Sequence, residues 1–347
     1  MLQKLSYFFL LPFSLIYDVA TRIRNRLFDW GFLKSEASPI FTINVGNLRV
    51  GGTGKTPHIE YLANYFVNKN IKIATLSRGY GRKTKGYLEA NPLTNSQEIG
   101  DEPKQFYTKF GDKVIVTVCE NRLLGIQKII QKNPKVSLVL LDDAFQHRAV
   151  KSTLNIMLSD YSKPFYSDYL MPAGRLREAK SGAKRADLII ITKCPKNITI
   201  VIKSDIIQKT KQYALAQTPI IFSSLEYDEP VSLFNKNSEN CLKKVVLLSG
   251  IAQSDIFCKD MAQKYTVIKH FNFHDHHQFT EKDLLAIQPF LNDEIKLLMT
   301  EKDSIKIKEL NLNKNFMNLL FYVPIKIVFS ENDALILDSM IKDKWER

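Results

Sequence analysis

The sequence predicts an α/β protein whose mostly parallel sheet lies between layers of helices. Apolar runs of strand length alternate with helical patterns through the first two thirds of the chain: residues 40–45, 71–76, 114–118, 138–141, 154–158 and 188–191. These runs are mostly apolar and do not alternate strictly between apolar and polar residues, as expected for parallel strands that are buried on both faces. The first run is followed by a glycine-rich loop, residues 51–56, and a helical pattern, residues 58–66. This order is typical of the P-loop NTPase fold.

The composition is that of a folded protein of about two domains. Of its 347 residues, 45% are hydrophobic and 24% are charged. The net charge of +13 favours an anionic partner. The four cysteines are too scattered for metal sites and too few for a disulfide framework, which indicates a reducing, cytoplasmic compartment. We expect three regions: an amphipathic, membrane-associating helix in 1–36, a P-loop core in 37–220, and a smaller α/β domain in 221–347 that closes the active-site cleft.

The N-terminal segment 5–20 is apolar but is interrupted by Pro12 and Asp18. It is shorter than the roughly 20 residues that a membrane-spanning helix needs. The following basic residues argue against a secretory signal peptide: Arg22, Arg24 and Arg26. We therefore expect a helix that lies in the membrane interface, with its arginines at anionic head groups. The alternative is a helix that packs on the protein's own core.

The loop after the first predicted strand has the pattern of a phosphate cradle. Backbone N–H groups and the helix dipole would face the anion, Lys55 would reach the β- and γ-phosphates, and the Thr56 hydroxyl would reach Mg²⁺. The strict pattern has glycine at position 49, where this chain has Arg49, so the motif is a variant. The alternative is an ordinary glycine-rich turn. The expected nucleotide contacts are Arg49, Val50, Gly51, Gly52, Thr53, Gly54, Lys55 and Thr56.

Residues 191–195 indicate which nucleotide binds. They follow a predicted strand as the guanine-reading [NT]-K-x-D motif does in GTPases, but Pro195 stands where that motif has aspartate. The sequence therefore favours ATP over GTP.

Asp142 and Asp143 end a buried apolar run, as the metal-binding carboxylate of a Walker B segment does. Mg²⁺ prefers oxygen ligands and retains water, so one aspartate is expected to bind directly and its neighbour through water. The alternative for this pair is a turn or a helix cap.

Two further segments carry groups suited to acid–base chemistry. Asp101 and Glu102 lie in a Gly-Asp-Glu-Pro loop before a helical pattern; their residue types suit a base and a metal ligand, although helix capping by Asp101 is the stronger interpretation from the residues alone. Four histidines cluster late in the chain: His270, His274, His276 and His277. No thiol pair accompanies them, so we expect an acid–base role for His276, paired with a carboxylate across the cleft, rather than zinc binding. A solvated surface loop is the alternative.

A basic stretch and a change in composition complete the pattern. Residues 175–185 carry five cations after a Met-Pro-Ala-Gly loop, which suits phosphate contacts, and they lack the aromatic residues typical of single-strand nucleic-acid binding. Residues 217–240 are rich in Pro, Ser and Asn and predict a linker. Strand-like runs then follow at 245–248, 296–299 and 319–328.

The motifs together resemble one family, the tetraacyldisaccharide 4′-kinases, or lipid A 4′-kinases. The matching segments are VGNLRVGGTGKTP (45–57), SRGYGRK (77–83), GDEP (100–103), DDAFQH (142–147), MPAGRLRE (171–178), DHHQF (275–279) and MTEKDSIK (299–306). The resemblance implies transfer of the ATP γ-phosphate to the 4′-hydroxyl of a tetraacyldisaccharide 1-phosphate, giving lipid IVA. It also implies an acylated glucosamine disaccharide phosphate and an anionic membrane surface as partners, with neither nucleic acid nor an obligate protein partner. The place of action would be the cytoplasmic face of the bacterial inner membrane.

The resemblance also implies roles for individual residues. Asp101 looks like a general base that acts as a dyad with His276, while Glu102, Asp142 and Asp143 look like Mg²⁺-site residues. Positions expected around the phosphates or the lipid head group are Arg78, Arg122, Gln146, His147, Arg177 and Glu178. The chain departs from the family pattern at Ala144, Arg175 and Ala179, and none of these is a reacting group.

The alternative function is a membrane-associated P-loop ATPase switch similar to the partitioning ATPases, whose loops resemble residues 51–56. That class predicts neither the carboxylate pair at 101–102 nor the distal histidine segment at 275–277.

Overall fold

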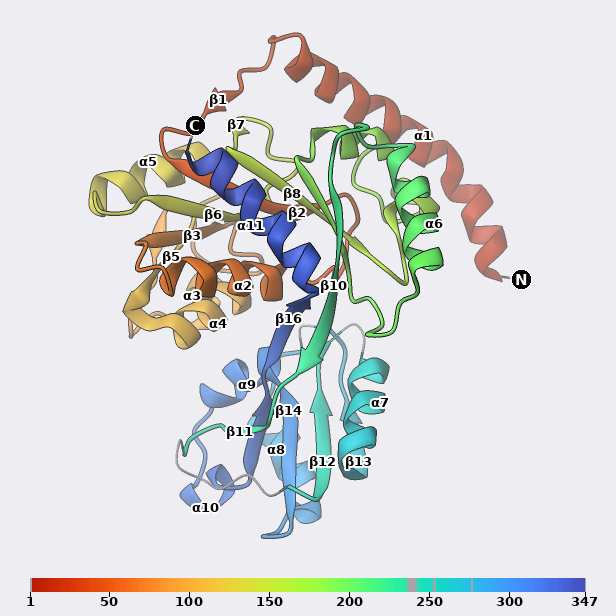
Figure 1. Cartoon of the computed structure of the whole chain (residues 1–347). Coiled ribbons are helices and arrows are strands. Elements are labelled where there is room, and N and C mark those ends of the chain that lie inside the picture. Colours follow the sequence, from red (N-terminus) through yellow and green to blue (C-terminus); the bar gives the residue numbers. More distant parts are fainter. Residues whose placement is uncertain (1, 236–241, 252–253, 276, 347) are drawn as a thin grey trace.

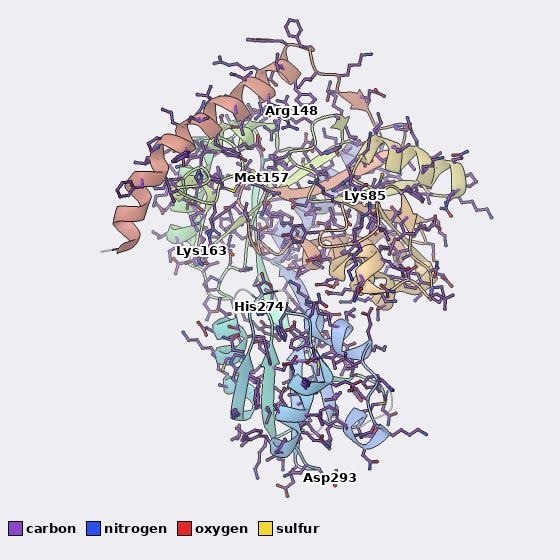
Figure 2. The ribbon with its side chains drawn as sticks, turned by 180° about the vertical axis from the view of Figure 1, so that it is seen from behind. Lys85, Arg148, Met157, Lys163, His274 and Asp293 are labelled. Carbon is purple, nitrogen blue, oxygen red and sulfur yellow. The ribbon has the colours of Figure 1, made fainter. Side chains whose placement is uncertain are left out.

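The protein has two lobes that are joined through two adjacent strands (Figure 1). The computed structural model describes residues 2–235, 242–251, 254–275 and 277–346. The larger lobe contains a nine-stranded sheet in the order β16-β10-β9-β8-β2-β6-β3-β5-β4, and the smaller lobe contains a five-stranded sheet in the order β11-β15-β14-β12-β13. Seen from behind, His274 lies at the junction of the lobes and Asp293 at the far tip of the smaller one (Figure 2).

The sheet of the larger lobe is parallel except at its two edge strands, β4 and β16. Its strands are β2 (Phe41–Asn47), β3 (Ile73–Ser77), β4 (Leu88–Glu89), β5 (Val114–Val118), β6 (Leu138–Asp142), β8 (Leu154–Asp160), β9 (Leu188–Thr192), β10 (Ile220–Tyr227) and β16 (Ile325–Phe329). A separate parallel pair joins β1 (Glu36–Ala37) to β7 (Val150–Lys151). The predicted α/β class and mostly parallel sheet are confirmed.

Helices cover both faces of this sheet, which explains why its central strands are mostly apolar. On β6, Leu138 and Leu140 pack in the cluster that holds Leu337, while Val139 and Leu141 pack on the opposite face. The helices of this lobe are α1 (Leu2–Asp29), α2 (Lys55–Val67), α3 (Ser96–Ile99), α4 (Asp101–Phe110), α5 (Arg122–Lys132), α6 (Ile200–Lys211) and α11 (Glu331–Trp345), with 3₁₀ turns at Gly111–Lys113, Phe165–Ser167 and Lys180–Arg185. The central strands β3, β6 and β9 are therefore shielded from water on both sides.

The smaller lobe is a second α/β unit. Its strands are β11 (Val231–Ser232), β12 (Lys244–Ser249), β13 (Thr266–Asn272), β14 (Ile295–Thr300) and β15 (Leu320–Val323). Its helices are α7 (Ser254–Lys264), α8 (Glu281–Ile287), α9 (Glu301–Lys308) and α10 (Lys314–Met317), with a 3₁₀ turn at Gln288–Phe290. The central strands β12 and β14 supply its core, in which Val246, Leu248 and Leu297 have no exposed surface.

The structure differs from the sequence prediction around residues 217–240. Strand β10 occupies much of the expected linker, because Ile221 and Phe222 are buried in the larger lobe. Strand β16 pairs antiparallel with β10, and the following α11 packs Leu337 and Ile341 into the core of the larger lobe. Residues 221–347 therefore contribute to both lobes.

The N-terminal helix α1 is longer than the predicted apolar segment and lies along the outside of the larger lobe (Figure 1). One side of it contacts the lobe: Ser14 Oγ donates to the Leu170 carbonyl at 3.0 Å, and Tyr17 donates to the Arg177 carbonyl at 2.8 Å. Large apolar side chains at helical spacing remain exposed on it: Phe9, Phe13, Ile16 and Ile23. In the part of the chain that is described, no helix has both the length and the apolar character to cross a bilayer.

Candidate active site

A cavity of about 1710 Å³ lies between the two lobes. Loops after β2, β3, β6 and β9 line it on the larger lobe, and residues of α7 and α9 line it on the smaller lobe. The carboxyl ends of parallel strands are where α/β sheets bind ligands. The volume exceeds the roughly 300–1,000 Å³ of a typical single-ligand pocket, so two substrates fit together.

The loop after β2 has the conformation that an anion cradle requires. Gly51 and Gly54 have φ of +117° and +84°, in the left-handed region that favours glycine, and α2 begins directly after Gly54. Asn47 donates to Thr53 Oγ1 at 2.6 Å, and the Thr192 hydroxyl donates to the Thr53 carbonyl at 2.9 Å. These bonds hold the loop so that the amino end of α2 faces the cavity.

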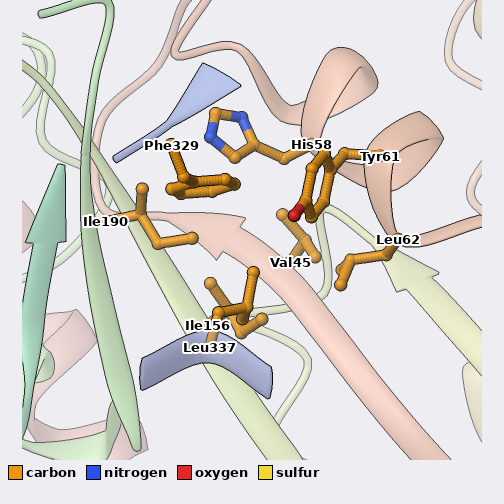
Figure 3. A pocket seen from close by; sticks show the side chains of 8 residues that line it. All are labelled: Val45, His58, Tyr61, Leu62, Ile156, Ile190, Phe329 and Leu337. Atoms are coloured by element: carbon orange, nitrogen blue, oxygen red, sulfur yellow. The ribbon is translucent and has the colours of Figure 1, made fainter. Parts of the chain in front are cut away.

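His58, one turn into α2, ties this loop to the strand that leads to the smaller lobe. Its Nδ1 lies 2.7 Å from the Gly54 carbonyl and its Nε2 lies 3.0 Å from Ser223 Oγ on β10. Because the carbonyl can only accept, Nδ1 carries the proton and Nε2 accepts from Ser223. Burial lowers the pKa of His58 to about 4. The apolar cavity beside it, about 10 Å³, is a packing gap in the core (Figure 3).

The two aspartates after β6 have different surroundings. Asp142 is buried, and its Oδ1 has no hydrogen-bond partner among the described residues. Burial, and then the neighbouring charge of Asp143, raise the pKa of Asp142 to about 7. Asp143 is also desolvated, but Lys55 at 3.7 Å and a two-pronged contact from Arg177, at 3.0 and 2.7 Å, bring its pKa below the ordinary value.

These carboxylates fit Mg²⁺. The unpartnered oxygen of Asp142 lies beside the phosphate loop, where a divalent cation would compensate it. Among the described residues, no three His, Cys, Asp or Glu side chains are grouped to hold a metal by themselves. Mg²⁺ in phosphoryl-transfer sites typically uses one or two carboxylates together with substrate phosphates and water, so a complete protein cage is not required.

Asp101 is the first residue of α4, and Gly100 is its N-cap position, so Asp101 does not cap the helix. Its Oδ2 lies 3.0 Å from Nζ of Lys306 on α9 of the smaller lobe. Lys306 also donates to the His277 carbonyl at 2.9 Å. Glu102 lines the cavity. His276, the predicted partner of Asp101, lies outside the described residues.

Cationic side chains form the wall opposite the smaller lobe. Arg122 is buried and donates to the carbonyls of Cys119 and Asp142, at 2.6 and 3.3 Å. Burial, followed by the charge of Arg122, lowers the pKa of His147 to about 4, so this ring is neutral at pH 7. Arg78 lines the same wall.

The cavity brings together most of the predicted site residues: Val50, Gly51, Gly52, Thr53, Gly54, Lys55, Thr56, Arg78, Glu102, Arg122, Asp142, Asp143, Gln146, His147 and Arg177. Arg49 instead pairs with Asp168 at 2.5 Å. Glu178 is buried, where Arg185 and Gln146 donate to it at 2.7 and 2.9 Å. Arg49, Glu178 and Asp101 are not part of the lining; Asp101 lies at the contact of α4 with α9, next to the lining residue Glu102.

The lining also includes residues that were not predicted as site residues, among them a cation from α1 and a cation from the loop after β9. Arg24 reaches the cavity from α1, and it donates to the Gln146 carbonyl at 3.0 Å. Lys193 donates to the Gly52 carbonyl at 2.5 Å and pairs with Asp160 at 3.0 Å. The strand-Thr-Lys pattern at 188–193 was the available signal for Lys193, whereas the sequence contains no signal that brings α1 to the cavity.

The chain is similar to one family over nearly its whole length. A profile of the LpxK family, tetraacyldisaccharide-1-P 4′-kinase, matches residues 6–344. The tetraacyldisaccharide 4′-kinase of Cytophaga hutchinsonii is 39% identical over 97% of both chains. That of Flavobacterium psychrophilum is 43% identical over 93% of both chains. The crystal structure of LpxK from Aquifex aeolicus in complex with ATP has a TM-score of 0.78 at 28% identity, covering 99% of this chain and 100% of that one.

Proposed function

This chain belongs to the tetraacyldisaccharide 4′-kinase family and is an ATP-dependent kinase of lipid A biosynthesis, and we propose how its cavity performs the transfer. The reaction moves the γ-phosphate of ATP to the 4′-hydroxyl of a tetraacyldisaccharide 1-phosphate and forms lipid IVA. The match spans the distal segments as well as the phosphate loop, so a partitioning-type ATPase switch is not favoured. The observation that carries the proposal is that the phosphate loop, the β6 aspartates and Glu102 line one cavity.

The larger lobe holds the nucleotide in this proposal. The phosphates of ATP occupy the cradle of residues 50–56, with Lys55 at the β- and γ-phosphates. Thr56, Glu102, Asp142 and Asp143 are the residues that would hold Mg²⁺. The ion would neutralise charge on the phosphates. Arg177 and Lys55 keep Asp143 ionised and oriented.

Asp101 is the proposed general base. As the 4′-oxygen bonds to the γ-phosphorus and the bond to ADP breaks, the hydroxyl proton passes to the Asp101 carboxylate. His276 is its proposed partner. The cations of the opposite wall, Arg78 and Arg122, bind phosphate oxygens of the acceptor or of the transferring group, and Gln146, with the neutral ring of His147, completes that wall. Arg49 and Glu178 support the site by holding its loops.

The helix α1 provides the proposed contact with the anionic surface of the inner membrane. Its outer side presents apolar residues to the acyl region, while Arg24 on its inner side lines the cavity. The acceptor's acyl chains would therefore stay in the bilayer while its head group enters the cavity. The smaller lobe closes the cleft over both substrates.

The test measures transfer of label from γ-labelled ATP to the tetraacyldisaccharide 1-phosphate in detergent with Mg²⁺. We expect labelled lipid from the wild type, essentially none from Lys55→Met, and a kcat lower by about 10²- to 10³-fold for Asp101→Asn. Lys69→Met, at the other end of α2, is the matched lysine control and should retain activity. Label that reaches lipid equally well in Lys55→Met or Asp101→Asn would refute the assigned roles.

A further inference from the structure

Lys306 connects the two lobes at the proposed base. Its side chain is almost fully buried on α9, and Nζ contacts Asp101 Oδ2 at 3.0 Å and the His277 carbonyl at 2.9 Å. Asp101 belongs to the larger lobe, whereas His277 belongs to the smaller lobe, in the histidine loop, by which we mean the described residues between β13 and α8 (273–275 and 277–280). The His277 ring lies 4.8 Å from that of His274, which Figure 2 labels at the junction of the lobes. One ammonium group therefore holds the proposed base and the histidine loop together.

Other contacts already dock α9 on the larger lobe. At its amino end, Glu301 accepts from Lys109 of α4 at 2.9 Å. Just beyond its carboxyl end, Glu309 accepts from the Ser96 amide and hydroxyl, at 3.0 and 2.7 Å. Within the smaller lobe, Lys302, one turn before Lys306, contacts Asp275 of the histidine loop at 3.2 Å and so holds this loop to α9. The helix is thus fixed at both ends without Lys306, so packing of the lobes does not require this ammonium.

Burying the ammonium needs compensation. Desolvation of a lysine is unfavourable, and this cost is offset only where its partners are held in good geometry. The side chain of Lys306 has both partners within hydrogen-bond distance, and each partner is part of the interlobe junction. The group therefore defines the direction of the Asp101 carboxylate more strictly than a solvated lysine would.

We propose that Lys306 is a positioning residue for phosphoryl transfer, which acts by orienting the Asp101 carboxylate and the histidine loop toward the acceptor hydroxyl. This inference rests on the proposed role of Asp101 as base. A base that is misplaced by about 1 Å loses on the order of 10²-fold in rate, because transfer depends on the aligned geometry. The loop that binds the phosphates of ATP, residues 50–56, lies on other elements. ATP binding therefore does not depend on Lys306.

The first experiment compares Lys306→Met with Glu309→Gln, which weakens the contact with Ser96 just beyond the end of the same helix. We expect Lys306→Met to lower kcat about 10²-fold with the KM for ATP within about twofold of wild type. Glu309→Gln should change neither by more than about twofold, and Lys306→Arg should restore part of the lost kcat. The proposal would be overturned if Lys306→Met and Glu309→Gln lowered kcat equally, or if folded Lys306→Met had the kcat of the wild type.

The second experiment is a double-variant cycle with Asp101→Asn. If Lys306 acts through Asp101, then Asp101→Asn/Lys306→Met should have the same kcat as Asp101→Asn alone. This double variant removes both charges of the Asp101–Lys306 pair, so it should fold even if Lys306→Met does not. A further loss in the double variant would show that Lys306 acts independently and would overturn the inference. A wild-type kcat for Asp101→Asn would instead refute the base assignment on which the inference rests.

Discussion

Asp142 and Asp143 are neighbours in sequence, but the pKa of Asp142 is raised and that of Asp143 is lowered from the ordinary value. Asp143 has Lys55 and Arg177 as partners, whereas Asp142 has a buried oxygen without a donor among the described residues. Two adjacent buried carboxylates repel each other, so the second stays ionised only with a cation beside it. The arrangement favours Asp142 as the direct ligand of Mg²⁺ and Asp143 as its oriented neighbour.

Arg177 should be sensitive to a substitution that keeps its charge. Its guanidinium contacts both oxygens of Asp143 and also the Asn47 side chain, and lysine cannot reproduce this planar arrangement. We expect Arg177→Lys to lower kcat/KM by about 10-fold or more while unfolding at an unchanged temperature. Steady-state kinetics and thermal denaturation check this, and wild-type kinetics would contradict it.

His58 should make the protein sensitive to mild acid. Its pKa is about 4 in the folded state against an ordinary 6.5, so the unfolded chain takes up the proton first as the pH falls. The stability that the neutral ring contributes is complete above pH 6.5 and is lost toward pH 4. We expect the free energy of unfolding, measured with urea, to fall by about 2 kcal/mol more in the wild type than in His58→Gln when the pH is lowered from 7 to 5. The same loss in both proteins would contradict this.

The site residues that belong to a local sequence motif were predicted from the sequence. Lys55, Asp142 and Asp143 follow predicted strands, and the structure places all three on one cavity. Arg24 and Lys306 were not predicted as site residues because their partners lie far away in sequence: Arg24 contacts Gln146, and Lys306 contacts Asp101. Such pairs depend on tertiary packing, which no local pattern encodes.

At the scale of elements, α1 has one face for the protein and another that faces outward. Phe13 and Ile16 are more than half exposed, whereas Ser14 and Tyr17 contact the larger lobe. The sequence left open whether this helix lies on a membrane or packs on the core. In the structure one face packs on the lobe and the other remains exposed.

Adding a charge to the outer face of α1 should separate membrane binding from chemistry. We expect Phe13→Glu and Ile16→Glu to reduce binding to anionic phospholipid vesicles several-fold, because a carboxylate opposes both apolar insertion and the negative surface. Activity on detergent-solubilised acceptor should stay within about twofold of wild type. Vesicle co-sedimentation measures binding, with Leu93→Glu, on an exposed loop, as the matched control. Unchanged binding of both α1 variants would refute the membrane role.

Elements with a strong local signal were predicted and others were not. The strand prediction at 114–118 coincides with β5, because four of its five residues are β-branched apolar residues. Strand β13 was missed because most of its residues are exposed. Its sequence therefore has neither the apolar run nor the apolar–polar alternation that predicts a strand. Strand β10 was missed because Pro219 and the serines around it resemble a linker, although its first half is buried in the sheet.

At the scale of the whole molecule, two connections control the cleft. Strands β10 and β16 join the lobes on one side, and α4 packs on α9 on another. Closure of the cleft should therefore be a rotation that leaves the α4–α9 contact in place and moves α7 toward the larger lobe. The predicted division at residue 221 missed this geometry because it rested on composition.

Spin labels can test this rotation. We expect the distance between labels at Lys163 and Lys259, both exposed, to shorten when ATP and the acceptor bind together. A second pair at Gln97 and Lys308, which spans the contact of α9 with the larger lobe, should keep its distance. Both pairs are measured by pulsed electron paramagnetic resonance after replacement of the native cysteines. A constant first distance, or equal changes in both, would contradict hinged closure.

The order of elements along the chain also determines which lobe can fold first during translation. The chain leaves the larger lobe at β10, forms the smaller lobe and then returns as β16 and α11. During translation the core of the larger lobe therefore lacks Leu337 and Ile341 until the whole smaller lobe has emerged from the ribosome. The nucleotide-binding half, although it begins first, is the half that is completed last, and the inserted lobe can fold ahead of it.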